Sequence, residues 1–367
     1  MQVEESVVPG VSRRDFLKYC SWVAGMIGLG VGGTPRVASA IESIAKRPSV
    51  VYGSFQACTG CAIQLLQNRE PGVANLILKT ISLDYQDNVM AAAGDAAEEV
   101  WRQVTGQEGF FFVIEGSIPM GIPGAMTIHG RTAQEIILEA VPNAAGIIAY
   151  GSCAAYGNIQ ASNPNPTGAV GVQEFLAGEL GADAPAVINL PRCPGHGDDI
   201  VVVLMSVLLT GKLPALDPKG RPLFLYGQTI HDSCFRRGHF EAGEFVEQFG
   251  DEHTKDDWCL YKVGCKGPYT YAPCGKALWN GNVSWCVHNA PCQGCAEQGF
   301  WDDLTPFYEQ PRGGEFAWKV APVETIGAVV GGATVLGLGA YAVAQNRRMK
   351  AAERSPSDAE PKRGGDV

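Results

Sequence analysis

The chain has 367 residues, enough for about two domains, and hydrophobic residues make up 46 % of it, enough for a sizeable core. Its formal net charge of −10 argues against a nucleic-acid binder, which would need a basic face. Cysteine is the unusual residue, with twelve in the chain. Cys20 lies in a segment that we expect to be removed, and the eleven that remain are an odd number for a disulfide framework.

The N-terminus has the features of an export signal. Two adjacent arginines in Ser12–Lys18 precede a moderately apolar stretch, Tyr19–Gly33, and Ala38–Ala40 is a small-residue cleavage signature. The sequence SRRDFLK resembles the twin-arginine signal, which exports proteins that are already folded. An ordinary secretion signal is the alternative. We predict that residues 1–40 are a twin-arginine signal peptide.

A second apolar segment lies near the C-terminus. Residues 325–344 carry no charge, and their length matches the ~20 residues of a membrane-spanning helix. The basic residues that follow directly are Arg347, Arg348 and Lys350. By the positive-inside rule they place that end in the cytoplasm and the bulk of the chain on the periplasmic side of the membrane. A buried core helix is the alternative. We expect residues 313–324 to be a linker and residues 345–367 to be a disordered cytoplasmic tail.

The segment 41–226 has the pattern of an α/β domain. The short apolar runs that indicate buried parallel strands are Ser49–Tyr52, Phe110–Ile114, Gly146–Tyr150 and Ala186–Leu190. The helical patterns between them are Gln86–Ala93, Thr132–Ala140, Val172–Leu180 and Asp199–Leu209. Strands that alternate with helices favour a flavodoxin-like, doubly wound parallel sheet.

Cysteines follow three of these strands. Cys58 and Cys61 come after the first strand, Cys153 after the third and Cys193 after the fourth. In open α/β sheets, ligands bind beyond the carboxyl ends of the strands, so we expect these four thiols to converge there. Four thiolates hold either zinc or an iron–sulfur cluster, and their spacing does not separate the two. A redox dithiol would leave Cys153 and Cys193 without a role.

Residues 227–312 form a second, irregular and cysteine-rich segment. Regular periodicity fades there, so metal–ligand bonds would supply its folding energy. Its candidate ligands are His231, Cys234, Cys259, Cys265, Cys274, Cys286, Cys292 and Cys295. Eleven cysteines plus His231 make three sets of four ligands with none left over. Zinc would use the same ligands.

Several motifs together resemble the small subunit of [NiFe] hydrogenases over nearly the whole chain. They are CTGC at Cys58–Cys61, EGSIP from Glu115, GSCAAYG around Cys153, NPNPTG from Asn163, LPRCPGHGDD around Cys193, TIHDSCFRRGHFEAGEF from Thr229 and PCQGCAEQGFWD from Pro291.

The resemblance implies three iron–sulfur clusters in a row. The proximal four-iron cluster would take Cys58, Cys61, Cys153 and Cys193. The distal four-iron cluster would take His231, Cys234, Cys259 and Cys265. The medial cluster would take Cys274, Cys292 and Cys295, with Cys286 in question. Many relatives have a proline at the position of Cys286 and a three-iron medial cluster, so Cys286 suggests four irons here.

Three further positions depart from relatives. Oxygen-tolerant relatives carry two extra cysteines near the proximal cluster, and the matching positions here are Gly60 and Asn158. We therefore predict an ordinary proximal cluster and an oxygen-sensitive enzyme. Many relatives have glutamate directly before CTGC, where this chain has Ala57, so a proton-relay role of that glutamate is not carried over.

The implied function is electron relay. The Ni–Fe centre would lie in a separate large subunit, and electrons from H2 would pass through the three clusters to a membrane acceptor. By resemblance, a haem b protein that passes electrons to quinone is the expected acceptor, and another membrane iron–sulfur partner is the alternative. Arg236, Arg237 and Lys266 would either guide an acidic partner or form a solvated surface. The competing functions are an iron–sulfur subunit of a different membrane redox enzyme, and an exported protein with structural zinc.

Overall fold

The computed structural model divides into two units, residues 1–312 and residues 313–367. The residues that it describes are 13–26, 28–35, 37–38, 47–68, 81–276, 288, 290–310 and 334–347.

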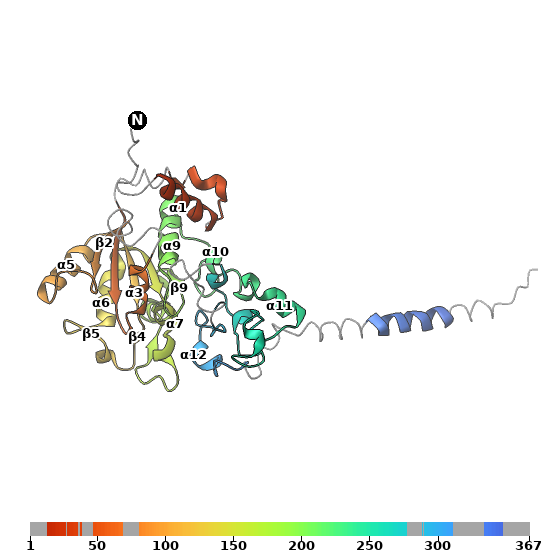
Figure 1. Ribbon diagram of the computed structural model, residues 1–367. Helices are drawn as coiled ribbons and strands as arrows, with labels where there is room; N and C mark the ends of the chain where they lie inside the picture. Colours follow the sequence, from red (N-terminus) through yellow and green to blue (C-terminus); the bar gives the residue numbers. More distant parts are fainter. Residues whose placement is uncertain are drawn as a thin grey trace, which may run out of the picture. The chain divides into compact units, whose positions relative to one another are not determined.

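The first unit is built on a five-stranded sheet whose paired strands are all parallel (Figure 1). The strands are β1 (Ser49–Ser54), β2 (Ser82–Gln86), β3 (Phe110–Glu115), β7 (Ala144–Tyr150) and β9 (Val187–Leu190). Their order across the sheet is β2-β1-β3-β7-β9. Numbered along the sheet's own strands, this is the order 2-1-3-4-5 of flavodoxin-like sheets, whose ligands bind beyond the strand ends where the order reverses.

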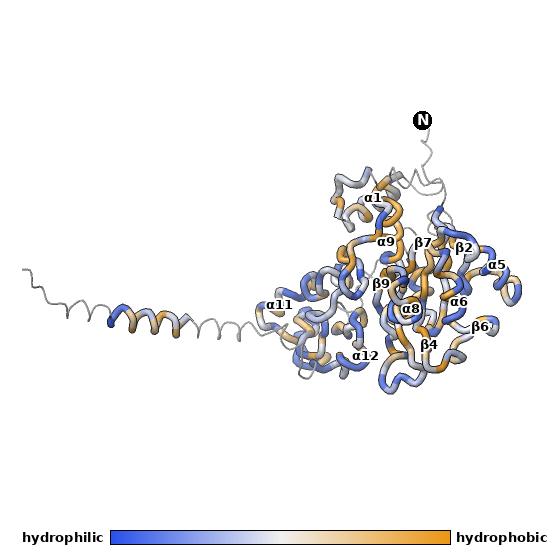
Figure 2. Tube along the Cα trace, turned by 180° about the vertical axis from the view of Figure 1, so that it is seen from behind, coloured by the Kyte–Doolittle hydropathy of each residue, from blue (hydrophilic) through white to orange (hydrophobic). Residues whose placement is uncertain are grey.

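Helices cover both faces of this sheet, so it is doubly wound. One hydrophobic core contains residues of α3 (Gly60–Leu66) and α9 (Gly197–Thr210). The other core contains residues of α5 (Asp95–Thr105), α6 (Ala133–Ala140) and α8 (Val172–Leu180). Figure 2 shows the strands and α9 as the most hydrophobic part of this unit.

Side chains of each strand alternate between these two cores. In β3, Phe111 and Val113 pack into the core of α3 and α9, whereas Phe110, Phe112 and Ile114 pack into the other core. A strand that is buried on both faces is apolar throughout, which explains why β3 reads as an unbroken apolar run.

The four predicted strands and three of the four predicted helices are confirmed, and with them the α/β parallel sheet. The predicted helix Gln86–Ala93 is wrong. Gln86 ends β2, a strand that the apolar pattern did not predict, and the next helix begins at Asp95. The side-chain oxygen of buried Gln86 accepts hydrogen bonds from the backbone N–H groups of Asn88 and Val89, both at 2.8 Å. These bonds close a turn where the apolar pattern alone had indicated a helix.

Short elements complete the α/β half. The short strands pair antiparallel as β4 with β8 and β5 with β6. Their bounds are β4 (Ile118–Pro119), β5 (Thr127–Ile128), β6 (Arg131–Thr132) and β8 (Ala169–Val170). The remaining helical segments are α7 (Ser152–Tyr156) and the 3-10 turns η1 (Val31–Gly33), η3 (Pro123–Ala125), η4 (Val141–Asn143), η5 (Asn158–Ala161) and η6 (Gly181–Asp183).

Helix α1 (Arg13–Met26) lies in the predicted signal peptide, of which residues 1–12, 27, 36 and 39–40 are outside the described part. Its side chains Cys20, Val23 and Ala24 are buried in the same core as α9. Removal of this segment from the mature chain stays a prediction.

After α9 the chain has only short elements, as the fading periodicity predicts. They are α10 (Leu223–Tyr226), η7 (His231–Ser233), α11 (Arg237–Ala242), η8 (Glu252–Thr254), η9 (Gly267–Tyr269), η10 (Pro273–Gly275) and α12 (Phe300–Asp303). A separate small core is formed by Val246, Leu260 and Val263. Other side chains of this segment, such as Ile230, Ala272 and Ala296, pack into the core of α3 and α9.

The described part of the second unit is a helix over 334–347 that is apolar along most of its length and hydrophilic at one end (Figure 2). Residues 325–333 of the predicted span, the predicted linker and residues 348–367 of the tail lie outside the described residues. Among the residues that the structure describes, no helix has the length and apolar character needed to cross a membrane.

The two cores predict how truncation of leucines affects stability. Leu204 of α9 is 1 % exposed, and Leu213, just beyond that helix, is 45 % exposed. Leu204→Ala should lower the unfolding free energy by about 2–5 kcal/mol, because it leaves a cavity in the core. Leu213→Ala should change it by less than about 0.5 kcal/mol. Denaturant titration of the purified complex measures both, and equal losses would contradict this core assignment.

Candidate metal centres

The first group of thiols, which we call the proximal group, consists of Cys58, Cys61, Cys153 and Cys193. Cys58 lies between β1 and α3, Cys61 lies in the first turn of α3, Cys153 lies in the first turn of α7 after β7, and Cys193 follows β9. The sheet topology therefore brings all four to its carboxyl edge, as the sequence predicts. Space there is limited: a Cβ atom at Gly151, whose φ is +88°, would lie 2.4 Å from Cys61 Sγ.

Nitrogen donors point at the sulfurs of the proximal group. Asn158 Nδ2 donates to Cys153 Sγ at 3.1 Å and to Cys193 Sγ at 3.4 Å. The backbone N–H of Gly195 donates to Cys61 Sγ at 3.2 Å. Such bonds favour negatively charged sulfur. Asn158 occupies a position where oxygen-tolerant relatives were expected to carry an extra cysteine, and here it hydrogen bonds two of the four thiols.

Burial acts against the charged form of these same thiols. It raises the pKa of Cys153 to about 11 and raises that of Cys193, with nearby thiols adding to the effect. The pKa of Cys61 is raised well above its ordinary value, by burial and then by Glu115. Without bound metal, the thiols of Cys61, Cys153 and Cys193 would therefore be protonated at neutral pH. Bound metal cations reverse this preference, since they favour the thiolate.

Glu115 hydrogen bonds the backbone next to the proximal group. The sequence analysis placed it in a motif and assigned it no role. It ends β3, is 1 % exposed and accepts hydrogen bonds from Tyr52 Oη at 2.6 Å and from the backbone N–H groups of Cys61 and Ala62 at 3.1 and 3.2 Å. Burial raises its pKa. The sequence signal that could have identified Glu115 is a single acidic residue at the end of an otherwise apolar strand.

The second group, which we call the distal group, consists of His231, Cys234, Cys259 and Cys265. All four line one hollow, which encloses about 390 Å³ of space between protein atoms, its mouth included. Burial lowers the pKa of His231 and raises that of Cys259 to about 11. A lowered pKa keeps the imidazole neutral at pH 7, the form that coordinates metals. Residues with these four donors thus surround a space that no side chain fills.

The third group, which we call the medial group, contains Cys274, Cys292 and Cys295. The fourth predicted member, Cys286, lies outside the described residues. Cys274 and Cys292 are 3 % and 2 % exposed. The backbone N–H of Gly294 donates to Cys292 Sγ at 3.4 Å, and Cys292 Sγ lies 3.6 Å from Thr270 Oγ1. Burial raises the pKa of Cys274 and of Cys295.

Hydrogen bonds link the three groups into one series. Arg192, which directly precedes Cys193 of the proximal group, donates from Nη1 to Cys274 Sγ in the medial group at 3.7 Å, and Ser152 Oγ, directly before Cys153, donates to the carbonyl of Cys295. The backbone N–H of Cys292 in the medial group donates to Cys265 Sγ in the distal group at 3.4 Å. The order in space is therefore proximal, medial, distal, with direct contacts at both junctions.

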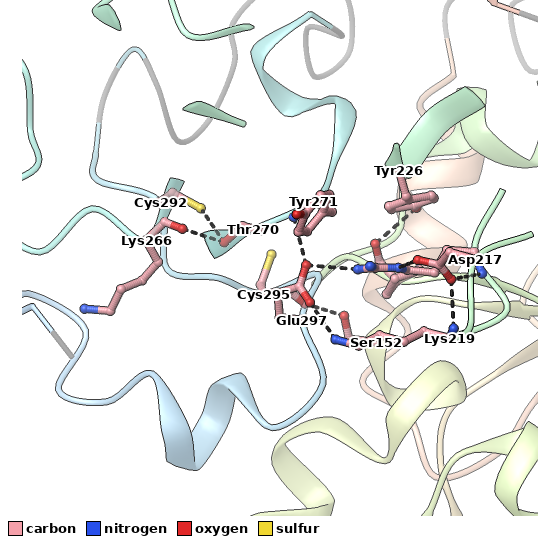
Figure 3. A network of polar contacts seen from close by, with 12 residues as sticks. Ser152, Asp217, Lys219, Tyr226, Lys266, Thr270, Tyr271, Cys292, Cys295 and Glu297 are labelled. Atoms are coloured by element: carbon pink, nitrogen blue, oxygen red, sulfur yellow. Dashed lines mark hydrogen bonds and ion pairs between the residues drawn. The ribbon is translucent and has the colours of Figure 1, made fainter. Parts of the chain in front are cut away.

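A buried ionic network fixes the medial group on the α/β half (Figure 3). Arg221 lies between Asp217 and Glu297, at 2.7 and 2.9 Å. Glu297 also accepts from Lys219 Nζ at 2.8 Å and from the backbone N–H of Tyr271 at 2.8 Å. Glu297 is two residues from Cys295, and Tyr271 is three residues from Cys274. The network thereby ties both cysteine-bearing segments to the loop before α10.

Two of the three basic residues predicted near the electron exit are not on the surface. Arg236 is 5 % exposed and pairs with Asp257 at 2.7 Å, and Lys266 is fully buried, with Nζ donating to the carbonyl of Gly264 at 3.1 Å. Arg237 is exposed. The prediction of a basic guide or solvated face is therefore wrong for Arg236 and Lys266, because local acceptors draw both side chains inward.

The donors of these groups are spread out. Within the part of the chain that the structure describes, no three His, Cys, Asp or Glu side chains converge closely enough to hold a single metal ion.

A parallel sheet with thiols at its carboxyl edge and a cysteine-rich extension defines an α/β protein rich in potential metal ligands, and comparison with known proteins specifies the family. Residues 226–308 match the model for the C-terminal region of the NiFe/NiFeSe hydrogenase small subunit, and residues 58–207 match that for the NADH ubiquinone oxidoreductase 20 Kd subunit.

Full-length relatives agree. The chain is 45 % identical over 306 residues to the periplasmic [NiFe] hydrogenase small subunit 1 of Nitratidesulfovibrio vulgaris, an alignment that covers 82 % of this chain and 94 % of that protein. It is 40 % identical over 346 residues to the quinone-reactive Ni/Fe-hydrogenase small chain of Wolinella succinogenes, covering 91 % and 96 %. A crystal structure of the Ni-Fe-Se hydrogenase from Desulfomicrobium baculatum superposes with a TM-score of 0.67 at 35 % identity, covering 72 % of this chain and all of that one.

This chain belongs to the small-subunit family of [NiFe] hydrogenases. It is the electron-transfer partner of a large subunit that holds the Ni–Fe active site, and its family carries iron–sulfur clusters.

The buried network around Glu297 predicts a difference between two Glu→Gln variants. Glu297→Gln removes one of the two carboxylates that pair with Arg221, which is 5 % exposed, and should lower stability by about 1–3 kcal/mol. Glu241→Gln removes an exposed ion pair with Arg237 and should cost less than about 1 kcal/mol. Thermal unfolding of both purified complexes distinguishes them. If Glu297→Gln proved as mild as Glu241→Gln, the network would not be what fixes the medial group.

Proposed function

We propose that this protein relays electrons from H2 oxidation in the large subunit through three iron–sulfur clusters to a membrane acceptor. The observation that carries this proposal is the series of three donor groups joined by hydrogen bonds from Arg192, next to Cys193, to Cys274 and from Cys292 to Cys265. Contact between successive groups is what a one-electron relay needs.

The proposed ligand sets follow the three groups. The proximal group and the distal group would each hold a four-iron cluster. The medial group would hold a four-iron cluster with Cys286 as its fourth ligand, or a three-iron cluster without it. A bound cluster supplies a one-electron carrier whose potential responds to ligand type, hydrogen bonds to sulfur and burial.

The chain's own residues fit such anionic clusters. Asn158 and Gly195 aim nitrogen donors at proximal sulfurs, and Gly294 does the same at Cys292. A cluster spreads its ligands over several irons, which suits donors that do not converge on one ion. The neutral imidazole of His231 would replace a thiolate, remove one negative charge and favour the reduced distal cluster.

The large subunit would cover the proximal end. Cys58 and Cys193 are exposed thiols. Exposed apolar side chains lie in the loops and the helix start at the same edge of the sheet, and they are Ile63 (49 %), Met120 (37 %), Ile122 (52 %) and Ile159 (56 %). Apolar side chains exposed around these cysteines indicate a surface that a partner buries.

The distal end would deliver electrons to the membrane. One relative is named a quinone-reactive hydrogenase small chain, which supports a quinone-linked acceptor for this chain, such as a haem b membrane protein. The twin-arginine signal of residues 1–40 would export the folded subunit, and residues 325–344 would anchor it on the periplasmic side with its C-terminus in the cytoplasm. Release of protons outside and electron flow inward would then store energy as a proton gradient.

The match of residues 58–207 to a NADH ubiquinone oxidoreductase subunit supports a common α/β half with other membrane redox enzymes. The hydrogenase match of residues 226–308 favours hydrogenase over such an enzyme, because it covers all of the distal and medial donors.

The test of this function is H2-dependent reduction of a viologen dye by the tagged complex, purified without oxygen. We expect activity together with a nickel-containing larger subunit and a brown, iron-rich preparation. A brown preparation that stays inactive after reductive activation would favour another redox enzyme. A colourless zinc protein would overturn the relay, since zinc–thiolate sites do not carry electrons.

Cys286 provides a specific test of the medial cluster. Cys286→Pro should convert a four-iron cluster to a three-iron cluster, because one iron loses its thiolate ligand. Iron analysis and EPR spectroscopy of the oxidised complex should show one iron fewer and a new three-iron signal. Cys286→Ser, which offers a hydroxyl ligand of similar size, is the matched control. An unchanged iron content in Cys286→Pro would show that Cys286 is not a ligand.

The proposed anchor is tested by truncation. A chain that ends at residue 324 should move from the membrane fraction to the soluble fraction, keep viologen reduction and lose H2-dependent quinone reduction. A chain that lacks only residues 352–367 keeps the apolar segment and should remain in the membrane. If the 1–324 chain sedimented with salt-washed membranes as the full chain does, residues 325–344 would not be the anchor.

A further inference from the structure

A buried arginine lies at the junction of the proximal and medial groups. Arg192 is 0 % exposed and directly precedes Cys193 of the proximal group. Its Nη1 atom donates to Sγ of Cys274, in the medial group, at 3.7 Å. Its carbonyl accepts from the backbone N–H of Ser152 at 2.9 Å. One residue therefore contacts a medial thiol while its backbone helps to form the proximal edge.

The charge of this arginine is balanced by one carboxylate. Asp199, in the first turn of α9, is 2 % exposed, and Arg192 Nε donates to its Oδ2 at 3.0 Å, with Nη2 donating to both of its oxygens. Tyr226 Oη also donates to Oδ2, at 3.2 Å. Asp199 thus occupies one edge of the guanidinium and leaves Nη1 for the sulfur.

We propose that Arg192 and Asp199 form a buried pair that sets the reduction potential of the medial cluster, with opposite signs. This inference rests on the proposed function, since it assumes a cluster bound by Cys274. Reduction adds one negative charge to a cluster. A cationic donor to a cluster thiolate stabilises that charge, and a buried carboxylate beside it opposes the stabilisation, because both act at low dielectric.

The geometry fixes the sign of the effect of Arg192. Because the guanidinium donates from Nη1 to Cys274 Sγ, it favours negative charge on this sulfur. Arg192 is here a positioning residue, which acts on the cluster through Cys274.

The test is an EPR-monitored redox titration of the medial cluster in the anaerobically purified complex. Arg192→Gln should lower its potential, because the cation is lost while Asp199 stays. Asp199→Asn should raise it. Each shift should change the oxidised-to-reduced ratio at fixed potential by about tenfold, which is about 59 mV for a one-electron couple. Arg192→Lys retains the charge and should restore most of the wild-type value, and the double variant should fall between the two single ones.

A matched control lies on the other face of the sheet. Arg131 is partly buried and pairs with Glu98 at 2.6 Å and with Glu139, and Arg131→Gln should leave the medial potential unchanged. Shifts of the same sign in Arg192→Gln and Asp199→Asn, or no shift in either, would overturn the proposal. If the Arg192→Gln complex does not assemble, the medial potentials of Asp199→Asn and Arg192→Lys are compared instead. A medial potential that does not rise in Asp199→Asn would then overturn the proposal.

Failure of the proposed function would look different from failure of this inference. A wild-type complex without any medial iron–sulfur signal would contradict the relay itself. A wild-type complex with that signal, unmoved by both single variants, would contradict only the role of the Arg192–Asp199 pair.

Discussion

Most cysteine side chains that the structure describes lie where burial makes a lone thiolate unfavourable, and hydrogen-bond donors around them oppose that. Burial raises the pKa of Cys61, Cys274 and Cys295, so these sulfurs carry negative charge only beside cations or hydrogen-bond donors. The protein supplies the donors from its backbone and from Asn158, and bound metal would supply the cations. Because the cysteine-rich segment has only a small apolar core of its own, sulfur–metal bonds would add to its order.

The α/β half positions this chemistry by topology. A parallel sheet places the carboxyl ends of all its strands at one edge. Residues far apart in sequence, such as Cys61 and Cys193, therefore lie at the same edge. The series of donor groups then starts at an edge with exposed apolar side chains and continues into buried surroundings. Exposure at one end and burial in the middle are what a relay between a docked enzyme and a remote acceptor requires, since buried carriers are shielded from solvent oxidants.

Much of this arrangement was predictable from sequence, and the failures have physical causes. Strands that are apolar on both faces, such as β3, are recognisable, so the positions of Cys153 and Cys193 at strand ends followed. The segment after Gln86 was wrongly predicted to be a helix, because a hydrogen bond to the Gln86 side chain closes a turn there, which apolar periodicity does not reveal. Burial of Lys266 was hidden for a related reason: its acceptors include the carbonyl of Pro306, forty residues away in the chain. The division of the second half into distal and medial groups came from family resemblance and not from spacing.

The central claim is that electrons from H2 pass through this chain in single steps. The most direct measurement mixes the oxidised, anaerobic complex with H2, freezes it at successive times and follows the iron of this protein by Mössbauer and EPR spectroscopy. Without an external acceptor, all three proposed clusters should become reduced on the time scale of turnover, and exposure to an oxidising dye should reoxidise them. Iron in this protein that stays oxidised while H2 is consumed at the Ni–Fe site would contradict the account.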